Sequence, residues 1–113
     1  MEEFTTNWSR EELKAYILLY CAYANFTETK AEKDFIKQKV GDEKYKSVHR
    51  EFDRDNDYQR IQKIQAGIER FDYSKDEIDR LFQNIKKLFL QDGEIDILEE
   101  NIYRGLQHLL KQE

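Results

Sequence analysis

The 113-residue chain contains no proline, only four glycines and a single cysteine. Because proline breaks helices from within and glycine weakens them, these scarcities favour long helices joined by short connections. One cysteine, Cys21, excludes an internal disulfide bond and is typical of a reducing compartment.

Long apolar runs are missing as well. The longest, AYILLYCAYA, has about half of the residues that are needed to span a bilayer. The first residues, MEEFTTNW, lack the apolar stretch of a signal peptide. We therefore expect a cytoplasmic protein with no membrane span.

The charge is high and unevenly distributed. Charged residues make up 38% of the chain, and the net charge of −5 argues against a nucleic-acid partner. Residues 30–50 carry seven basic and four acidic side chains, whereas residues 90–113 carry two basic and six acidic ones. Such a dipolar charge distribution can steer a protein partner, although charged runs are more often solvated helix faces.

Capping boxes predict the starts of four helices. In a capping box, the first side chain accepts a backbone N–H near the helix start, and a Glu three residues later reaches back to the cap. The four pairs are Ser9/Glu12, Thr29/Glu32, Ser74/Glu77 and Asp96/Glu99.

Apolar residues spaced three or four apart follow each predicted start. This periodicity predicts helices over residues 9–24, 29–40, 42–55, 57–72, 74–90 and 96–111, with Gly41 as a C-cap and no strand. We expect an all-α, single-domain bundle of about six helices, with residues 1–8 as a loose N-terminal segment. The most continuous stripe, which includes Phe82, Ile85 and Phe89, should be buried against the first and last helices.

Two segments resemble each other at an offset of 67 residues. Residues 24–36 and 91–103 each contain a five-residue joint, a capping box and an apolar pair, so the predicted fold has two helix-loop-helix units. The similarity has two explanations of equal weight, an internal duplication or convergence on one way of joining two helices.

Two acidic stretches could be cation loops. DRDNDYQRIQKI, from Asp53, has the acids of an EF-hand but lacks its glycine at position six and its glutamate at position twelve, so Asn56 or Asp57 is better explained as an N-cap. In DGEID, Gly93 can end one helix and Asp96 can cap the next. On the residues alone, this simple joint is favoured over a metal site.

A joint does not explain the crowding of Asp92, Glu94 and Glu100, whose like charges repel. A hard divalent cation would offset this repulsion, and carboxylate oxygens are the ligands that Ca²⁺ and Mg²⁺ prefer. The metal-site alternative therefore stays open, with Ca²⁺ or Mg²⁺ as the ion.

The DGEID joint, between an aromatic-rich helix and one with the sequence ILEE at its start, resembles the TerB-like tellurite-resistance family. The resemblance implies a small helical bacterial protein of the stress response, related to modules of DnaJ-type co-chaperones. It also implies acidic loops that bind divalent cations, with Asp92, Glu94, Asp96 and Glu99 as the ligands. The family's earlier acidic loop falls on NFTET, where Phe26 replaces the glycine and the acids are Glu28 and Glu32.

The remaining polar candidates have structural explanations. Cys21 is expected to be an inert buried thiol, His49 to lie at the edge of the core, and His108 to lie in the last turn of the last helix. No catalytic set of nucleophile, base and orienting group is apparent, so we expect no enzyme.

Two functions follow. The first is a non-enzymatic, TerB-like module that binds a divalent cation at residues 92–99 and an unidentified protein partner. The alternative is an adaptor bundle whose basic residues 30–50 bind a protein partner without a metal.

Overall fold

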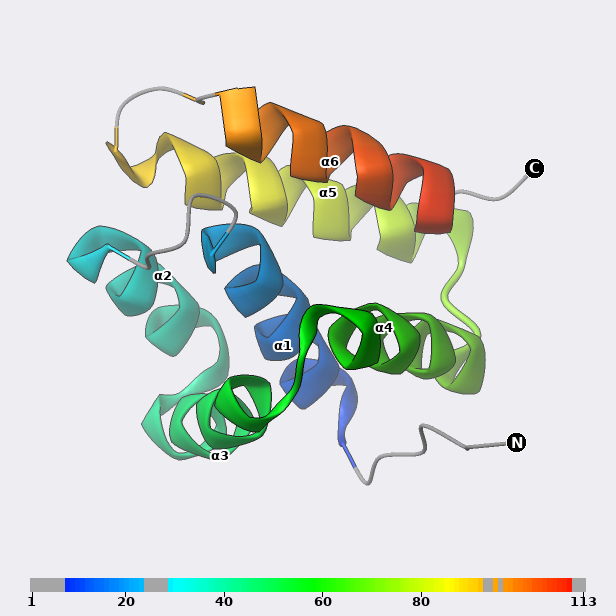
Figure 1. Ribbon diagram of the computed structural model, residues 1–113, viewed down its shortest axis with the longest axis horizontal. Coiled ribbons are helices and arrows are strands. Elements are labelled where there is room, and N and C mark those ends of the chain that lie inside the picture. The colour runs from blue at the N-terminus through cyan, green and yellow to red at the C-terminus, as the bar shows by residue number, and fades with distance from the viewer. Residues whose placement is uncertain (1–7, 24–28, 93–94, 96, 111–113) are drawn as a thin grey trace.

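The computed structural model describes residues 8–23, 29–92, 95 and 97–110, and within these ranges the chain forms six α-helices and no strand (Figure 1). Their bounds are α1 Arg10–Ala22, α2 Lys30–Val40, α3 Asp42–Arg54, α4 Asp57–Phe71, α5 Lys75–Phe89 and α6 Ile97–Leu110, and a short 3-10 helix, η2 Leu90–Asp92, follows α5. The radius of gyration of 13.1 Å matches the value of about 13 Å that a single globule of this length should have. The prediction of an all-α bundle is confirmed.

The helix starts agree with the capping boxes wherever these can be compared. The boxes at Ser9/Glu12, Thr29/Glu32 and Ser74/Glu77 are all formed, whereas Asp96 lies outside the described residues. Asn56, rather than Asp57, caps α4, and its partner is Gln59. Gly41 ends α2 with a φ of +91°, a backbone conformation that favours glycine.

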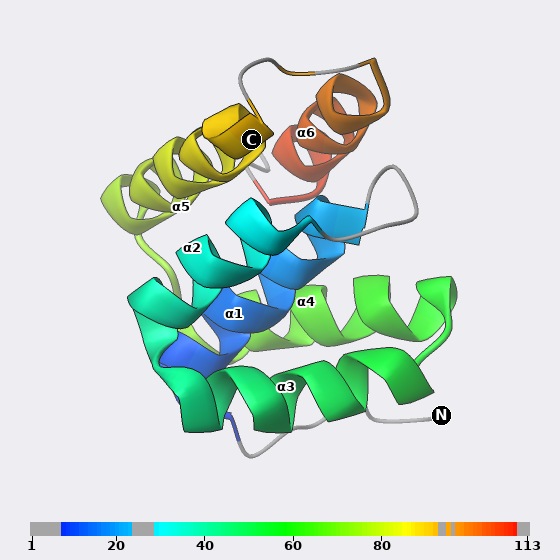
Figure 2. The same cartoon turned by 90° about the vertical axis from the view of Figure 1, so that its left-hand side faces the viewer.

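Helix α1 lies at the centre of the molecule and contacts all five other helices (Figures 1 and 2). The sequence pattern predicted one apolar stripe on this helix, but eight of its residues are buried, around most of its circumference. They are Leu13, Ala15, Tyr16, Ile17, Leu18, Leu19, Cys21 and Ala22. A helix that is buried on all sides needs apolar residues on all sides, which explains the run of these residues here.

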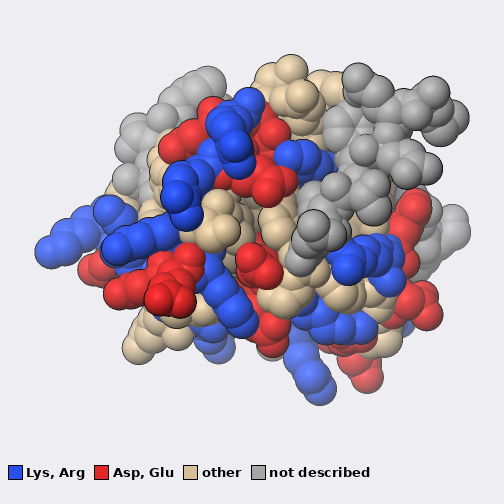
Figure 3. Space-filling view, turned by 90° about the horizontal axis from the view of Figure 1, so that it is seen from below, with Lys and Arg blue, Asp and Glu red and all other residues tan. Residues whose placement is uncertain are grey.

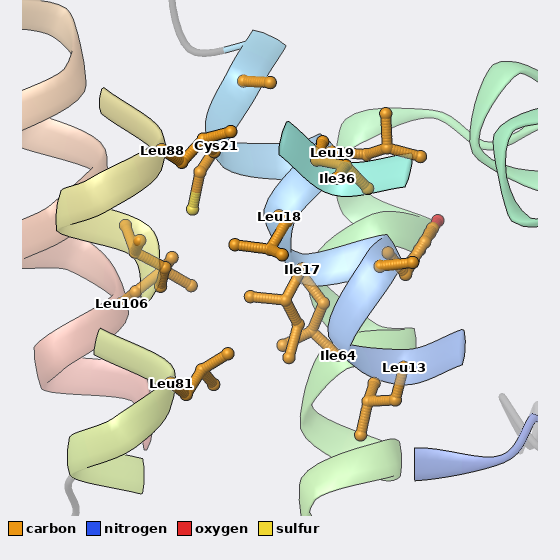
Figure 4. Close-up of a cluster of buried hydrophobic side chains, with 14 of the residues drawn as sticks. Leu13, Ile17, Leu18, Leu19, Cys21, Ile36, Ile64, Leu81, Leu88 and Leu106 are labelled. Atoms are coloured by element: carbon orange, nitrogen blue, oxygen red, sulfur yellow. The ribbon is translucent and has the colours of Figure 1, made fainter. Parts of the chain in front are cut away.

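The core forms where α1 meets its neighbours. Figure 4 shows Leu18 and Ile17 of α1 facing Leu106 of α6, with Leu81 and Leu88 of α5 beside them. The predicted burial of Phe82, Ile85 and Phe89 is confirmed, since each is at most 2% exposed and α5 packs on both α1 and α6. Phe82 makes an edge-on contact with Tyr103 of α6, with ring centroids 5.2 Å apart.

The structure differs from the sequence pattern at two positions. Leu98, which lies four residues before Ile102 and so fits the apolar spacing predicted for the last helix, is 41% exposed, and the neighbouring Glu99 is buried instead. Glu99 lies three, four and seven residues before Ile102, Tyr103 and Leu106, so it is on the same face of α6 as they are, whereas Leu98 lies at the edge of that face. Trp8, assigned to a loose segment, is buried against Tyr16 with ring centroids 4.5 Å apart. The rest of that segment, residues 1–7, lies outside the described residues.

Among the described helices, none combines the length and the apolar character that crossing a membrane requires.

Candidate functional site

The acidic joint lies between η2 and α6, and the structure describes it in part. Of the predicted metal ligands, Glu94 and Asp96 lie outside the described residues, and for Asp92 only the backbone, in η2, is described. Glu99 is therefore the one predicted ligand whose side chain can be placed. Within the described residues, no group of three or more His, Cys, Asp or Glu side chains is positioned to hold a metal ion.

Glu99 is 3% exposed, and one other charged residue of the described core, Glu32, is buried as deeply. The two occupy equivalent positions in the repeat of 67 residues. At the start of α2, the Thr29 N–H donates to Glu32 Oε1 at 3.0 Å and the Glu32 N–H donates to Thr29 Oγ1 at 3.1 Å. Glu32 is thus a capping residue that the fold has also buried completely.

The negative charges of both carboxylates raise the pKa of the same thiol. Cys21, near the end of α1, has a strongly raised pKa, first because it is buried and then because the negative charges of Glu32 and Glu99 disfavour a thiolate. Two acids 67 positions apart in the sequence thus both affect the ionisation of one side chain of the central helix. Figure 4 shows Cys21 next to Leu88 of α5. The expectation of an inert, buried thiol agrees with this environment, since thiolate is the reactive form.

The packing of the helix pairs explains why both acids affect the same thiol. The pair α1–α2 corresponds to the pair α5–α6, and α1 contacts α5 at the centre. The crossed contacts also form, α1 with α6 and α2 with α5, and η2 packs on α2. In Figure 1 the ends of α1 and α5 and the starts of α2 and α6 all gather at the upper left. Equivalent residues at the two joints, Glu32 and Glu99, are therefore both near enough to Cys21 to affect its ionisation.

The two histidines are held as structural residues. His49 is half-buried, with Nδ1 3.0 Å from Asp53 Oδ2 and Nε2 3.3 Å from the Tyr23 hydroxyl oxygen. Its ring also lies against Tyr45, with centroids 5.4 Å apart. His108 is exposed in the last turn of α6. These positions match the expectation of a core-edge residue and a residue near a helix C-terminus.

Two cavities on the surface carry an excess of basic side chains. One, of about 430 Å³, lies between α2 and α3 and is lined by Lys33, Tyr45, Lys46, His49 and Arg50. It falls within the basic segment 30–50. The other, of about 350 Å³, lies where α1, α2 and α5 meet. Sequence reasoning missed the second cavity, because its residues are spread over positions 10–84 and no local pattern joins them.

Comparisons of the chain with protein-family models, with curated proteins and with solved structures give no match. The resemblance to the TerB-like family therefore rests on the residues of the acidic joint and on the helical pattern.

Proposed function

We propose that the protein is a non-enzymatic helical module that binds a divalent cation, Ca²⁺ or Mg²⁺, at the acidic end of its two helix pairs. The observation that carries this proposal is the burial of both Glu32 and Glu99, whose negative charges both affect Cys21. Glu99 follows the acidic joint with Asp92, Glu94 and Asp96 in the sequence, and α2, which carries Glu32, packs on η2, where the joint begins.

The physical reason is the cost of burying charge. Moving carboxylates out of water costs several kcal/mol for each, and attraction to a nearby positive charge offsets that cost. A divalent cation bound by oxygens of the joint would supply such a charge close to both glutamates. Cation binding would then couple the α1–α2 pair to the α5–α6 pair, and so control the surface offered to a protein partner.

A partner-binding surface is available beside the joint. Leu90, Ile95, Ile97 and Leu98 are all exposed, Ile97 by 73%, within a stretch of nine residues. Exposed apolar side chains next to charged ones are typical of protein interfaces. In line with the resemblance to the TerB-like family, we place this module in the bacterial stress response.

The test measures thermal unfolding with Ca²⁺, with Mg²⁺ and with NaCl at matched ionic strength, because salt also screens an acidic protein. A cation at about a hundred times its Kd should add about 2.7 kcal/mol to the free energy of unfolding. Glu94→Gln should abolish this increase, and Glu43→Gln, which alters an exposed acid at the start of α3, should leave it unchanged. An equal response to NaCl, or an unchanged response of Glu94→Gln, would refute the cation site.

The cleft between α2 and α3 supports a second candidate function, an adaptor that binds an acidic protein segment without a metal. Its lining includes three cations and no carboxylate. Two other surface cavities each include acidic residues in their lining, Glu69 in one and Glu51 and Asp53 in the other. Lys33, Lys46 and Arg50 are all exposed and make no ion pair with a described carboxylate. Figure 3, which views the molecule from below Figure 1, shows basic and acidic side chains interleaved over this face.

An acidic peptide distinguishes the two functions. If the protein is such an adaptor, it should bind a poly-glutamate peptide with an affinity that falls as the salt concentration rises and that does not depend on Ca²⁺. Lys46→Glu should weaken this binding, whereas Lys87→Glu, on the exposed face of α5, should change it little. If both variants weaken binding equally, the peptide binds through general charge and the cleft is not its site.

A further inference from the structure

A second basic cavity opens between the start of α1, the end of α2 and the first turns of α5. Figure 2 shows the start of α1, the end of α2 and the first turns of α5 on the same side of the molecule, at the left of that view. The cavity there has a volume of about 350 Å³. Its lining residues are Arg10, Glu11, Lys14, Lys39, Tyr73, Glu77, Arg80, Leu81 and Asn84.

Two of these charges neutralise each other. Arg10 Nη1 donates to Glu77 Oε2, and Nη2 donates to the Phe71 carbonyl oxygen at 2.7 Å. The guanidinium also lies 5.2 Å from the centroid of the Tyr73 ring. This arrangement holds Arg10 and Glu77 as an ion pair against one wall of the cavity, and it joins the start of α1 to the start of α5.

The remaining charges are out of balance. Lys14, Lys39 and Arg80 line the cavity, and against these three cations stands one carboxylate, Glu11. None of the three makes an ion pair with a carboxylate among the described residues. The cavity thus carries a local charge of about +2 in a protein whose net charge is −5.

The protonation of Lys14 is affected by this crowding. Its pKa is lowered, first because the ammonium is partly buried and next because Lys39 is positively charged, while Glu11 acts in the opposite direction. The fold therefore holds two ammonium groups close enough to repel each other. An anion between them would remove that repulsion.

We propose that this cavity binds the phosphate group of a small phosphorylated molecule, with Lys14, Lys39 and Arg80 around the phosphate. A phosphate monoester carries a charge of about −2 near neutral pH, which matches the excess of the cavity. Its several acceptor oxygens suit two ammonium groups, a guanidinium and the amide N–H groups of Asn84. The Tyr73 ring offers an apolar wall to the rest of the ligand.

The shape of the site favours a small molecule over a macromolecule. A volume of about 350 Å³ lies within the range of about 300–1,000 Å³ that is usual for small-molecule sites. The cations come from three helices and converge on one hollow, whereas a nucleic-acid surface needs basic groups spread along a backbone.

The test titrates the ¹⁵N-labelled full chain with inorganic phosphate and follows the amide signals by NMR at constant ionic strength. Saturable shifts should centre on the Asn84 side-chain amide and on the first turns of α1. Lys14→Gln and Lys39→Gln should each weaken binding by about tenfold, the expected loss for one charge-assisted contact. Lys33→Gln, which removes a lysine of the α2–α3 cleft, is the matched control and should not weaken it.

Two further measurements sharpen the test. Glu11→Gln should tighten phosphate binding, because it removes the one unpaired carboxylate of the lining. Phosphate should raise the pKa of the Lys14 amine, observed through its side-chain signals in the intact protein. Shifts spread over all basic surfaces, or equal weakening by Lys33→Gln and Lys14→Gln, would overturn the proposal.

Comparison of ligands tests the size of the site. Glucose 6-phosphate should bind more tightly than inorganic phosphate, because the hollow has room for the sugar beside Tyr73. Tighter binding of a phosphoserine peptide than of glucose 6-phosphate would overturn the assignment to a small molecule.

Discussion

The hydroxyl of Tyr16, in the central helix α1, donates a hydrogen bond of 2.5 Å to Asp55 Oδ2 at the end of α3. Lys63 of α4 holds the same carboxylate, with Nζ 3.0 Å from Asp55 Oδ1 and 2.6 Å from Glu51 Oε2. Burial disfavours the charged form of Lys63, but the two carboxylates favour that form more strongly. The pKa of Lys63 is therefore raised. This polar cluster joins three helices at the edge of the core.

Tyr16→Phe should destabilise the protein by about 1.5–3 kcal/mol, the usual worth of a hydrogen bond to a charged group. The ring contacts with Trp8 and Phe52 should remain, since the phenyl ring is kept. Urea unfolding of the variant measures the loss. Tyr20→Phe, on the same helix but with no hydrogen bond to a described residue, is the control, and an equal loss in both variants would show that the Asp55 contact contributes nothing.

Stability should fall as the pH rises above about 10. Burial, helped by the charge of Asp57, raises the pKa of Tyr20 from 10.0 to about 12. The unfolded chain therefore releases this proton at a lower pH than the folded one, so the contribution is intact below pH 10 and is lost as the pH rises toward 12. Tyr20→Phe should flatten this decline in urea unfolding series taken from neutral pH to about 11. An unchanged slope would mean that the Tyr20 hydroxyl titrates alike in both states.

Gly67 of α4 lies against Leu13 of α1, with no room for a larger side chain. A Cβ added there would lie 2.6 Å from Leu13 Cδ1, and Leu13 is completely buried. Gly67→Ala should therefore cost about 1–3 kcal/mol through overpacking. In contrast, a Cβ on Gly105 of α6 meets nothing within 4 Å, so Gly105→Ala should stabilise the helix by about 0.5–1 kcal/mol.

A double variant checks the cause of the Gly67 effect. If the clash with Leu13 is responsible, Leu13→Ala combined with Gly67→Ala should lose less stability than the two single losses added together. If denaturant unfolding shows that the two single losses simply add in the double variant, the strain at Gly67→Ala does not come from the contact with Leu13.

Phe82→Ala should destabilise the protein by about 3–5 kcal/mol, because the ring is 2% exposed and its loss leaves a cavity between α5 and α6. Tyr58→Ala removes a ring that is 64% exposed, and it should change stability by no more than about 0.5 kcal/mol. Thermal unfolding followed by circular dichroism compares the two. A loss below about 1 kcal/mol for Phe82→Ala would contradict its place in the core.

The sequence determined where the helices begin, because a helix start depends on hydrogen bonds within about one turn. Ser9, Thr29 and Ser74 each accept the N–H of a glutamate three residues later, as their spacing predicted. The box at Asn56 was missed because its partner is Gln59, whose amide oxygen serves as well as a carboxylate.

The tertiary structure decided which residues meet, because the periodicity within one helix does not show which other helix packs against it. It buried Glu99 where the pattern placed Leu98, and it brought Glu32 to the same thiol from the other helix pair. The basic segment 30–50 could be read from the sequence, but the second cavity could not. Lys14 and Arg80 line it together because α1 packs across α5, a contact set by the shapes of the buried faces.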